Sequence, residues 1–192
     1  MASRKRLTRD DWVEAGLRAL LTGGPEAVAV EPVAARLDVT KGSGYWHFAD
    51  RSALLAAVLD LWVQRLTVDV VTALEVGGGS PRERMARLLQ VVTTGSEHTP
   101  TEMLVAVSQD PQVRAAVERA LALRLGYLER LVTEAGVPRG EAKARSALAY
   151  AAYLGHATLS ATVPSALPRG PAARRQMQQA LLELAIPAAV TR

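Results

Sequence analysis

The residues best suited to recognise another molecule lie in one short segment of this chain, from Thr40 to Phe48. Within it a lysine, a serine, a tyrosine, a tryptophan and a histidine stand almost side by side. Amino, hydroxyl, phenol and imidazole groups hydrogen-bond phosphate oxygens and the edges of bases. So many polar groups at adjacent positions make a poor buried core. The segment therefore predicts contacts with nucleic acid, made by Thr40, Lys41, Ser43, Tyr45, Trp46 and His47.

The residues that precede this segment predict how it is positioned. Residues 33–39, Val-Ala-Ala-Arg-Leu-Asp-Val, have the pattern of a short helix followed by a tight turn. A helix, a turn and a polar helix form the arrangement of helix-turn-helix DNA-binding proteins. The first nine residues are basic and contain no acid. A solvated tail and a phosphate-binding arm both fit this basic stretch. Because it precedes a helix-turn-helix, we expect Arg4, Lys5 and Arg6 to contact DNA.

Composition argues against several other classes of function. The chain has 192 residues, of which 49% are hydrophobic and only 4% aromatic, so we expect a core of Ala, Leu and Val. It has no cysteine, and its three histidines are widely spaced, so we expect no disulfide, metal site or cofactor. The sequence shows no paired nucleophile and base and no phosphate-binding glycine loop after a strand. We therefore expect that the protein is not an enzyme.

A membrane location is also not expected. The longest uncharged segment, residues 146–167, is rich in small side chains and contains His156 and Pro164. Small side chains have little affinity for hydrocarbon, so this segment predicts a buried helix. The basic start of the chain is interrupted by acidic residues and does not lead into an apolar run. We expect a soluble, cytoplasmic protein with no membrane partner.

The apolar residues recur with the period of a helix and nowhere alternate with the period of a strand. Glycine, proline and capping residues divide the pattern, and Gly77–Gly79 is the clearest loop. We expect N-caps at Thr40 and Asp50 and a capping box at Ser80 and Glu83. We expect an all-α fold of about nine helices, at residues 10–21, 30–37, 40–46, 51–74, from 81, from 99, 111–135, 140–161 and 171–185. Residues 1–51 would form the arm and a three-helix DNA-binding domain, with the helix-turn-helix at about 29–48. Residues 52–192 would form a larger helical domain for ligand binding and dimerisation.

The last two expected helices carry small and apolar residues at helical spacing. Small side chains on one side of the penultimate helix permit close approach of another helix, and the last helix has an apolar stripe. A packed pair within one chain explains the pattern, and so does a four-helix interface between two copies. A dimer gives a helix-turn-helix protein a second half-site. We therefore expect a homodimer with an interface formed by Ala147, Ala151, Gly155, Thr158, Met177, Leu181 and Leu184.

Residues 10–55 resemble the DNA-binding domain of TetR-family transcriptional regulators. The matching pieces are Val33-Ala34-x-x-Leu37-x-Val39, Lys41-Gly42-Ser43, Tyr45-Trp46-His47-Phe48 and Arg51-x-x-Leu54-Leu55. The resemblance implies that Lys41, Ser43 and Tyr45 face the major groove, that Tyr45 and His47 lie near phosphates, and that Arg51 binds phosphate. It also implies that Leu37, Val39 and Phe48 belong to the core.

Two alternatives remain open at these positions. Tyr45 and His47 also fit a packed hinge against the next helix. Trp46 fits either the edge of the DNA or the junction between the domains.

Three positions depart from the usual pattern of this family. Asp38 replaces a glycine in the turn, and Gly44 replaces an apolar residue. Ala29 replaces the serine or threonine cap of the preceding helix, which removes about 1 kcal/mol. Gly42 and Gly44 each cost a helix about 1 kcal/mol relative to alanine. We therefore predict that the segment at residues 38–46 is only weakly stable as a helix in the absence of DNA, so that its amide hydrogens exchange rapidly until DNA binds.

The resemblance also implies a mode of action. A homodimeric repressor would be released from a near-palindromic operator by a small-molecule effector that shifts the helix at residues 51–74. The candidate pocket residues are the large side chains Trp62, Met85, Met103, Tyr127 and Tyr153, although each of them also fits a plain core position. A ligand-independent architectural protein with the same DNA-binding domain remains the alternative.

Overall fold

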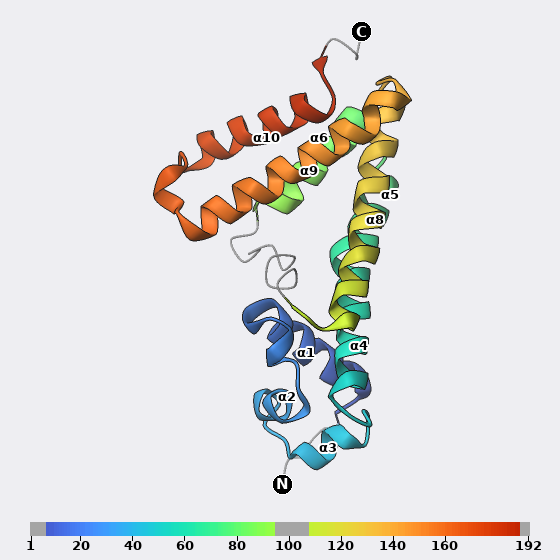
Figure 1. The fold of residues 1–192 in the computed structure, drawn as a ribbon, viewed down its shortest axis with the longest axis vertical. Coiled ribbons are helices and arrows are strands. Elements are labelled where there is room, and N and C mark those ends of the chain that lie inside the picture. Colours follow the sequence, from blue (N-terminus) through green and yellow to red (C-terminus); the bar gives the residue numbers. More distant parts are fainter. Residues whose placement is uncertain (1–6, 95–107, 189–192) are drawn as a thin grey trace. The chain divides into compact units, whose positions relative to one another are not determined.

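A computed structural model describes residues 7–94 and 108–188 of the chain. Within these residues the regular structure is entirely helical, so the predicted all-α fold is confirmed (Figure 1). None of the described helices is long and apolar enough to cross a membrane. The chain divides into two compact units. The first contains Met1–Leu66 and Thr101–Arg119, and the second contains Thr67–Pro100 and Ala120–Arg192.

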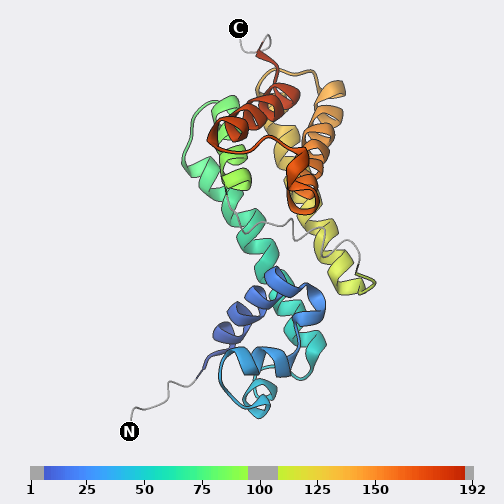
Figure 2. The ribbon, with the colours of Figure 1, turned by 90° about the vertical axis from the view of Figure 1, so that its left-hand side faces the viewer.

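The first unit is formed around the packing of its first helix. Its helices are α1 (Arg9–Gly23), α2 (Val30–Arg36), α3 (Lys41–Tyr45), α4 (Arg51–Val63) and the first turns of α8 (Pro111–Glu134). α1 packs along α4 (Figure 2). The two helices approach most closely at Gly16, where a Cβ atom would overlap the side chain of Val58. A larger residue at this position would force α1 and α4 apart.

Side-chain caps define where two of these helices begin. Thr8 and Asp11 form a capping box at α1, in which the Thr8 Oγ1 accepts a hydrogen bond from the Asp11 N–H at 3.2 Å. Asp50 caps α4, and its Oδ1 accepts a hydrogen bond from the Ala53 N–H at 2.8 Å. Each cap satisfies an N–H group that has no partner within the helix. The predicted cap at Asp50 is therefore confirmed.

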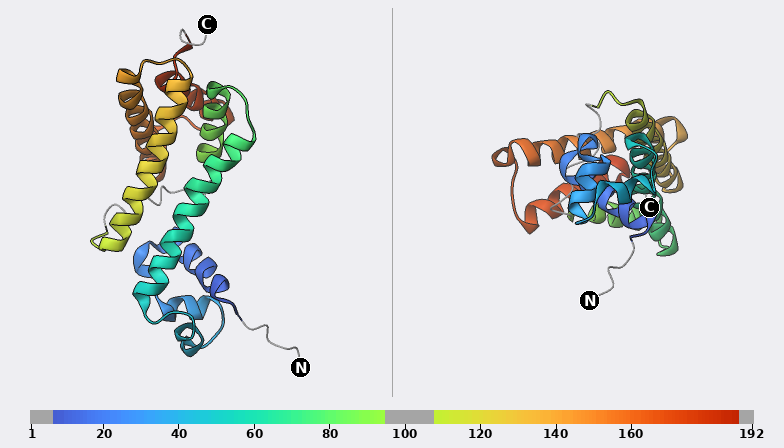
Figure 3. Two further views of the ribbon diagram at one scale, coloured as in Figure 1. Left: turned by 90° about the vertical axis from the view of Figure 1, so that its right-hand side faces the viewer. Right: turned by 90° about the horizontal axis from the view of Figure 1, so that it is seen from below.

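The second unit has a core of aliphatic side chains. Its helices are α5 (Asp69–Val76), α6 (Pro81–Thr94), the remainder of α8, α9 (Arg139–Thr162) and α10 (Pro171–Ala185). α10 lies against both α6 and α9 (Figure 3). The residues that fill this core include Leu74, Met85, Leu89, Leu131, Val132, Leu181 and Ile186. The capping box predicted at Ser80 and Glu83 is present at the start of α6.

The segment expected as one helix at residues 51–74 is interrupted. α4 ends at Val63, a π-helical turn follows at Gln64–Val68, and α5 continues to Val76. The division between the two units falls inside this turn, after Leu66, so α4 belongs to the first unit. Thr67 is buried, and its Oγ1 accepts a hydrogen bond from the Nε of Arg124 in α8 at 2.9 Å. Single π-helical turns within helices often occur at functional positions.

A charged network joins α5, α6 and α8 in the second unit. The Glu75 Oε1 accepts hydrogen bonds from the Arg84 Nη1 at 2.6 Å and from the Tyr127 hydroxyl at 2.9 Å. Arg84 also donates to Glu134, and the Arg130 Nη2 lies 3.3 Å from the same Glu75 oxygen. The hydrogen bond from Arg84 lowers the pKa of Glu75. Burial, followed by the bond to Glu75, raises the pKa of Tyr127 to about 12.

Candidate nucleic-acid interface and small-molecule pocket

The turn between α2 and α3 adopts the conformation that its sequence predicts. Asp38 has a φ of 53°, which is the left-handed region that glycine usually occupies. The N–H groups of Leu37 and Val39 both donate to the carbonyl of Ala34, each at 3.1 Å, and close the turn. Ala29 precedes α2 without a side-chain cap, as its residue type requires. The helix-turn-helix therefore forms although Asp38 is less suited to a left-handed turn than glycine, and Ala29 cannot cap α2 as serine or threonine would.

α3 begins and ends where the sequence predicts, but it lacks one expected stabilising contact. Thr40 occupies the N-cap position, yet its side chain accepts no capping hydrogen bond, so the predicted capping role of Thr40 is wrong. The backbone carbonyl of Thr40 accepts instead, from the Ser43 N–H at 3.0 Å. At the other end, the N–H groups of His47 and Phe48 both donate to the carbonyl of Gly44 at 2.9 Å.

Gly44 is the position at which α3 packs on the rest of the first unit. A Cβ atom there would lie 2.6 Å from the Cη2 of Trp12 and 2.7 Å from the Cγ1 of Val30. The indole of Trp12 is fully buried and fills the space that a larger residue at position 44 would need. Gly44 thus reflects a large-to-small pairing between α1 and α3. By contrast, Gly42 faces open space, with its nearest neighbour 3.8 Å away.

This packing leaves a row of polar and aromatic side chains at the surface. Lys41 is exposed, the Tyr45 side chain is 52% exposed, and the Trp46 side chain is 84% exposed. Ser43 and His47 are half-buried. An indole as exposed as that of Trp46 is unusual for a residue that only packs within its own chain.

The expected core residues differ in how deeply they are buried. Phe48 is buried, as expected, and the guanidinium of Arg9 lies 5.0 Å from the centre of its ring. Leu37 and Val39 are only half-buried. They belong to the turn and its edge, so the turn holds them nearer the surface than a helical position would, and neither belongs to the buried core as expected.

Two of the predicted DNA-contacting cations have partners within the first unit. The Lys41 Nζ lies 2.9 Å from the Glu31 Oε1, and this hydrogen bond raises the pKa of Lys41. Arg51 donates through Nη2 to the carbonyl of Pro25 at 3.0 Å, and its Nη1 lies 3.6 Å from the Asp110 Oδ2. Arg51 therefore ties the start of α4 to two neighbouring segments. Arg4, Lys5 and Arg6 lie outside the described residues.

The second unit contains a pocket of about 450 Å³. Its walls come from α6, α9, the connection that follows α9, and the first turns of α10. It is lined by Val92, Thr93, Tyr153, His156, Ala157, Ser160, Ala161, Pro164, Leu167, Pro168, Arg169, Gly170, Ala173, Arg174 and Met177. Pockets of this volume accommodate drug-sized small molecules.

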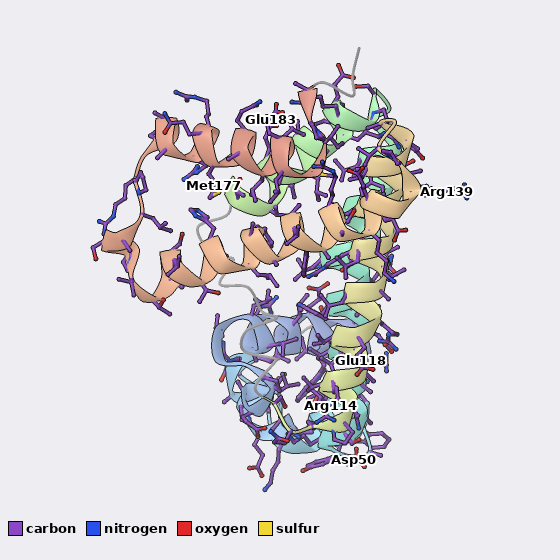
Figure 4. The ribbon with its side chains drawn as sticks, turned by 45° about the horizontal axis from the view of Figure 1, so that its top comes forward. Asp50, Arg114, Glu118, Arg139, Met177 and Glu183 are labelled. Atoms are coloured by element: carbon purple, nitrogen blue, oxygen red, sulfur yellow. The ribbon has the colours of Figure 1, made fainter. Side chains whose placement is uncertain are left out.

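The pocket brings together few of the side chains predicted to bind a ligand. Of the five candidates Tyr153 lines it, whereas Met85 and Tyr127 are buried in the core of the second unit. Trp62 is fully buried in α4, and Met103 lies outside the described residues. Met177, which we expected at a dimer interface, lines the pocket and lies on the side of α10 that faces α9 (Figure 4).

Several polar groups of the pocket were not singled out from the sequence. The ring of His156 lies 3.4 Å from the Ser160 hydroxyl, and partial burial lowers its pKa. Arg169 donates through Nε to the carbonyl of Pro164 at 3.1 Å. The available signal was His156, the one titratable imidazole in the long uncharged segment 146–167. Among the described residues no group of His, Cys, Asp or Glu could hold a metal ion.

The residues predicted for a dimer interface divide between the surface and the interior. Ala147, Ala151 and Gly155 are exposed on α9, and no atom lies within 4 Å of a Cβ built at Gly155. Leu184 is 37% exposed, whereas Leu181 is buried in the core. The remaining candidates are half-buried: Thr158 bonds the carbonyl of Leu154 at 2.7 Å, and Met177 lines the pocket.

Comparison with known proteins connects these features to a family. Residues 13–58 match the model of "Bacterial regulatory proteins, tetR family". The curated proteins include no sequence that matches this chain. Among solved structures, a putative transcriptional regulator from Saccharomonospora viridis in complex with choline has 19% identity and a TM-score of 0.73 over 90% of this chain and 92% of that one.

Two further structures show the same fold. NemR of E. coli in its reduced form has 17% identity and a TM-score of 0.73, covering 94% of this chain and 98% of that one. SCO4454, a TetR-family transcriptional regulator from Streptomyces coelicolor, has 16% identity and a TM-score of 0.71, covering 96% and 90%. The likeness to these structures therefore extends beyond the helix-turn-helix to most of the chain.

Proposed function

We propose that this chain, whose residues 13–58 match the model of the tetR family of bacterial regulatory proteins, acts as a homodimeric repressor which a small molecule releases from a near-palindromic operator. It is a DNA-binding regulator and not an enzyme. The observation that carries the proposal is the row of exposed side chains on and beside α3, because helix-turn-helix proteins read base edges with the helix at this position. A protein that regulates bacterial genes in this way would work in the cytoplasm.

The exposed residues of α3 suit different parts of a DNA duplex. Lys41 would exchange its exposed partner Glu31 for a phosphate oxygen, since ion pairs at the surface are weak. Ser43 and Tyr45 would reach base edges, where hydroxyl groups can donate and accept. Trp46 and His47 would lie against the sugar-phosphate backbone beside the groove. Arg51 would contact phosphate through the part of its guanidinium that remains exposed.

The proposed homodimer rests on the exposed face of α9. Ala147, Ala151 and Gly155 share this face with two leucines, Leu148 and Leu159, which are 58% and 43% exposed. Exposed apolar side chains at helical spacing beside small residues suit close packing of a second helix. A second copy of the chain is the partner that symmetry and two DNA half-sites favour.

The proposed ligand response rests on a chain of contacts between the pocket and the π-helical turn. Tyr153 lines the pocket, and its ring centre lies 6.1 Å from that of Tyr150. The Tyr150 hydroxyl accepts a hydrogen bond from the Arg124 Nη1 at 3.2 Å, and Arg124 in turn bonds Thr67 in the π-helical turn. A ligand that displaced Tyr153 would therefore act on the segment where the two units join. To release DNA it must bind one state of the protein more tightly than the other.

The proposal is tested by selecting duplexes from a random pool with the full-length protein and measuring their affinity by fluorescence anisotropy. We expect an enriched inverted repeat and a complex whose mass contains two copies of the chain. Lys41→Ala should weaken binding about equally for all sequences and reduce the salt dependence by roughly one phosphate contact. Tyr45→Ala should weaken binding of the selected sequence about tenfold or more.

Arg175→Ala is the matched control, because it removes an exposed positive charge from α10, outside the first unit. It should leave DNA binding unchanged. Enrichment of a single half-site by a monomer would contradict the homodimer, and the absence of any enriched sequence would contradict sequence-specific recognition.

A further inference from the structure

The pocket of the second unit has walls of one charge. Arg169 and Arg174 line it together with His156, and its lining includes no Asp or Glu from residues 7–94 and 108–188. The sequence around it is consistent with this, because no acidic residue occurs between Glu141 and Glu183. That interval covers nearly all of α9, the connection and most of α10.

The acidic residues at the ends of these helices are already engaged elsewhere. Glu141 lies 3.3 Å from the Arg145 Nε in α9, and Glu183 pairs with Arg82. Glu83, at the start of α6, accepts the hydrogen bonds of Ser80. None of these carboxylates lines the pocket. Within the described residues neither pocket arginine forms an ion pair, so no carboxylate in the described part of the chain neutralises the positive charge of the pocket.

One of the two arginines is held in place by the protein backbone. The bond from the Arg169 Nε to the Pro164 carbonyl fixes the base of the guanidinium at 3.1 Å and leaves its terminal nitrogens for another acceptor. Arg174 extends from the first turns of α10, and Gly170 and Ala173 from the same helix end also line the pocket. The positive end of the α10 dipole adds to the charge of the two side chains.

The rest of the lining is apolar. Val92 of α6, Ala157 and Ala161 of α9, and Leu167 and Met177 offer aliphatic or thioether surface. Methionine adapts its shape to irregular ligands. A volume of about 450 Å³ is too large for an inorganic anion alone. The pocket therefore combines a site for negative charge with a surface for an apolar body.

We propose that this pocket binds an amphipathic organic carboxylate, with its carboxylate at Arg169 and Arg174 and its apolar part against Leu167, Ala161 and Met177. Arginine matches the geometry of a carboxylate, since it can donate two parallel hydrogen bonds. Ser160 and Tyr153 line the same pocket, and their hydroxyl groups are candidates to complete the polar end of the site. The inference depends on the proposed function only for its consequence, which is release of DNA.

The first test measures binding to the full-length protein without DNA. Isothermal titration calorimetry with decanoate should show saturable binding, and decyltrimethylammonium, of the same chain length and opposite charge, should bind at least about tenfold more weakly. Acetate, which has the charge without the apolar chain, should not bind up to about 1 mM. Equal binding of the anion and the cation, or no saturable binding of decanoate, would overturn the proposal.

Charge reversal locates the carboxylate. Arg174→Glu should reduce the affinity for decanoate by about tenfold or more and should improve binding of decyltrimethylammonium. Arg175→Glu is the matched control, because Arg175 is exposed on the same helix but does not line the pocket. Circular dichroism and thermal unfolding should show that both variants remain folded. If the two substitutions had equal effects, the preference for decanoate over the cation would come from general surface charge, and the proposed carboxylate site would be wrong.

An independent readout comes from His156, which shares the pocket with Tyr153, Ser160, Arg169 and Arg174. Its pKa is lowered by partial burial, and a carboxylate bound nearby should raise it because negative charge favours the imidazolium. The shift is measured by NMR titration with and without decanoate. No change in the pKa of His156 at saturating decanoate would place the ligand outside this pocket and overturn the proposal.

Failure of this inference can be distinguished from failure of the proposed function. Decanoate that binds the pocket without weakening the complex with the selected operator would leave the ligand class intact and contradict ligand-driven release. Decanoate that does not bind, together with an intact specific complex of dimer and operator, would contradict only the ligand class.

Discussion

α3 and α9 both expose the residues on which the proposed function depends, but they are held in place in opposite ways. α3 has five residues, two of which are glycines, and no side-chain cap. α9 has 24 residues and good helix formers along its length. A single turn of helix is not stable alone, whereas a long helix rich in alanine approaches stability by itself. α3 therefore takes its shape from its neighbours, in particular from Trp12.

The difference between α3 and α9 indicates which kind of partner suits each exposed surface. The exposed side chains of α3 are polar or aromatic, so they indicate a polar partner, and the buried side of α3 is essentially the backbone of Gly44. The exposed face of α9 is apolar and small, so it indicates a second protein surface. Substitutions on the buried side of α3 should therefore act through folding of the first unit, and substitutions on the exposed face of α9 through association.

The largest effect on folding is expected at the contact between Trp12 and Gly44. Gly44→Ala would place a methyl group 2.6 Å from the indole, and overpacking of this kind costs about 1–3 kcal/mol. The free energy of unfolding is measured by urea denaturation, and affinity for the selected operator should fall in parallel. Gly42→Ala is the control, because that position is open and alanine favours a helix by about 1 kcal/mol.

A double variant separates the steric cause from a loss of backbone freedom. Trp12→Phe shortens the ring that the new methyl group at position 44 would meet. The pair Trp12→Phe and Gly44→Ala should therefore be more stable than the sum of the two single changes predicts. Strict additivity would show that α3 is not positioned by this contact.

The second effect is expected on dimerisation through the exposed face of α9. Ala151→Glu would place a charge in the exposed apolar face, and charge buried without a partner weakens an interface strongly. We expect the dimer dissociation constant to rise about a hundredfold or more, with helix content unchanged. Sedimentation velocity measures the first quantity and circular dichroism the second. Ala122→Glu, the same change at an exposed position of α8, should leave the dimer intact. A dimer that survives Ala151→Glu would contradict the proposed interface.

The third effect is a loss of stability of the second unit, expected when the charge of Glu75 is removed from its charged network. The pKa of Glu75 is lower in the folded protein than its ordinary value of 4.5. Above pH 4.5 the ionised carboxylate therefore stabilises the fold, and this contribution is lost as the pH falls through the lowered pKa.

Glu75→Gln should lower the denaturation midpoint at neutral pH, and the difference from the wild-type chain should shrink as the solution is acidified. Glu118→Gln removes an exposed carboxylate of α8 and should have little effect at any pH. A difference between wild type and Glu75→Gln that stays constant from neutral to acid pH would show that the network does not act through the charge of Glu75.

The smallest effect is expected where Glu31 pairs with Lys41. Glu31→Gln would remove a negative charge from the surface that approaches phosphate and would release Lys41 from its partner. Affinity for DNA should rise by a few-fold at low salt and by less at high salt, since both effects are screened. Anisotropy titrations at two salt concentrations measure it. Weaker binding of Glu31→Gln would show that the pair orients Lys41 productively.

The sequence predicted the local features of this protein because they depend on neighbouring residues. Proline, glycine and Asp50 mark helix ends by backbone geometry and capping, and the helices begin close to the expected positions. The turn at Asp38 followed from the helix-turn-helix pattern, whereas the pattern left open whether Tyr45 and Trp46 pack within the chain or face outward. The division of the chain at Leu66 did not follow, because the π-helical turn there has no signature in the apolar pattern.

The sequence by itself determined the all-α fold, the approximate starts of the helices and the segment proposed to read DNA, because short-range geometry and a specific local motif carry these properties. Only the tertiary structure decided how distant residues meet. It placed Trp12 against Gly44, which turned an apparently weak position into a packing requirement. It also placed Met85 and Tyr127 in the core of the second unit, and His156, Arg169 and Arg174 in the lining of one pocket. Such contacts depend on how helices that are far apart in the sequence pack together, and a local sequence pattern carries no information about that packing.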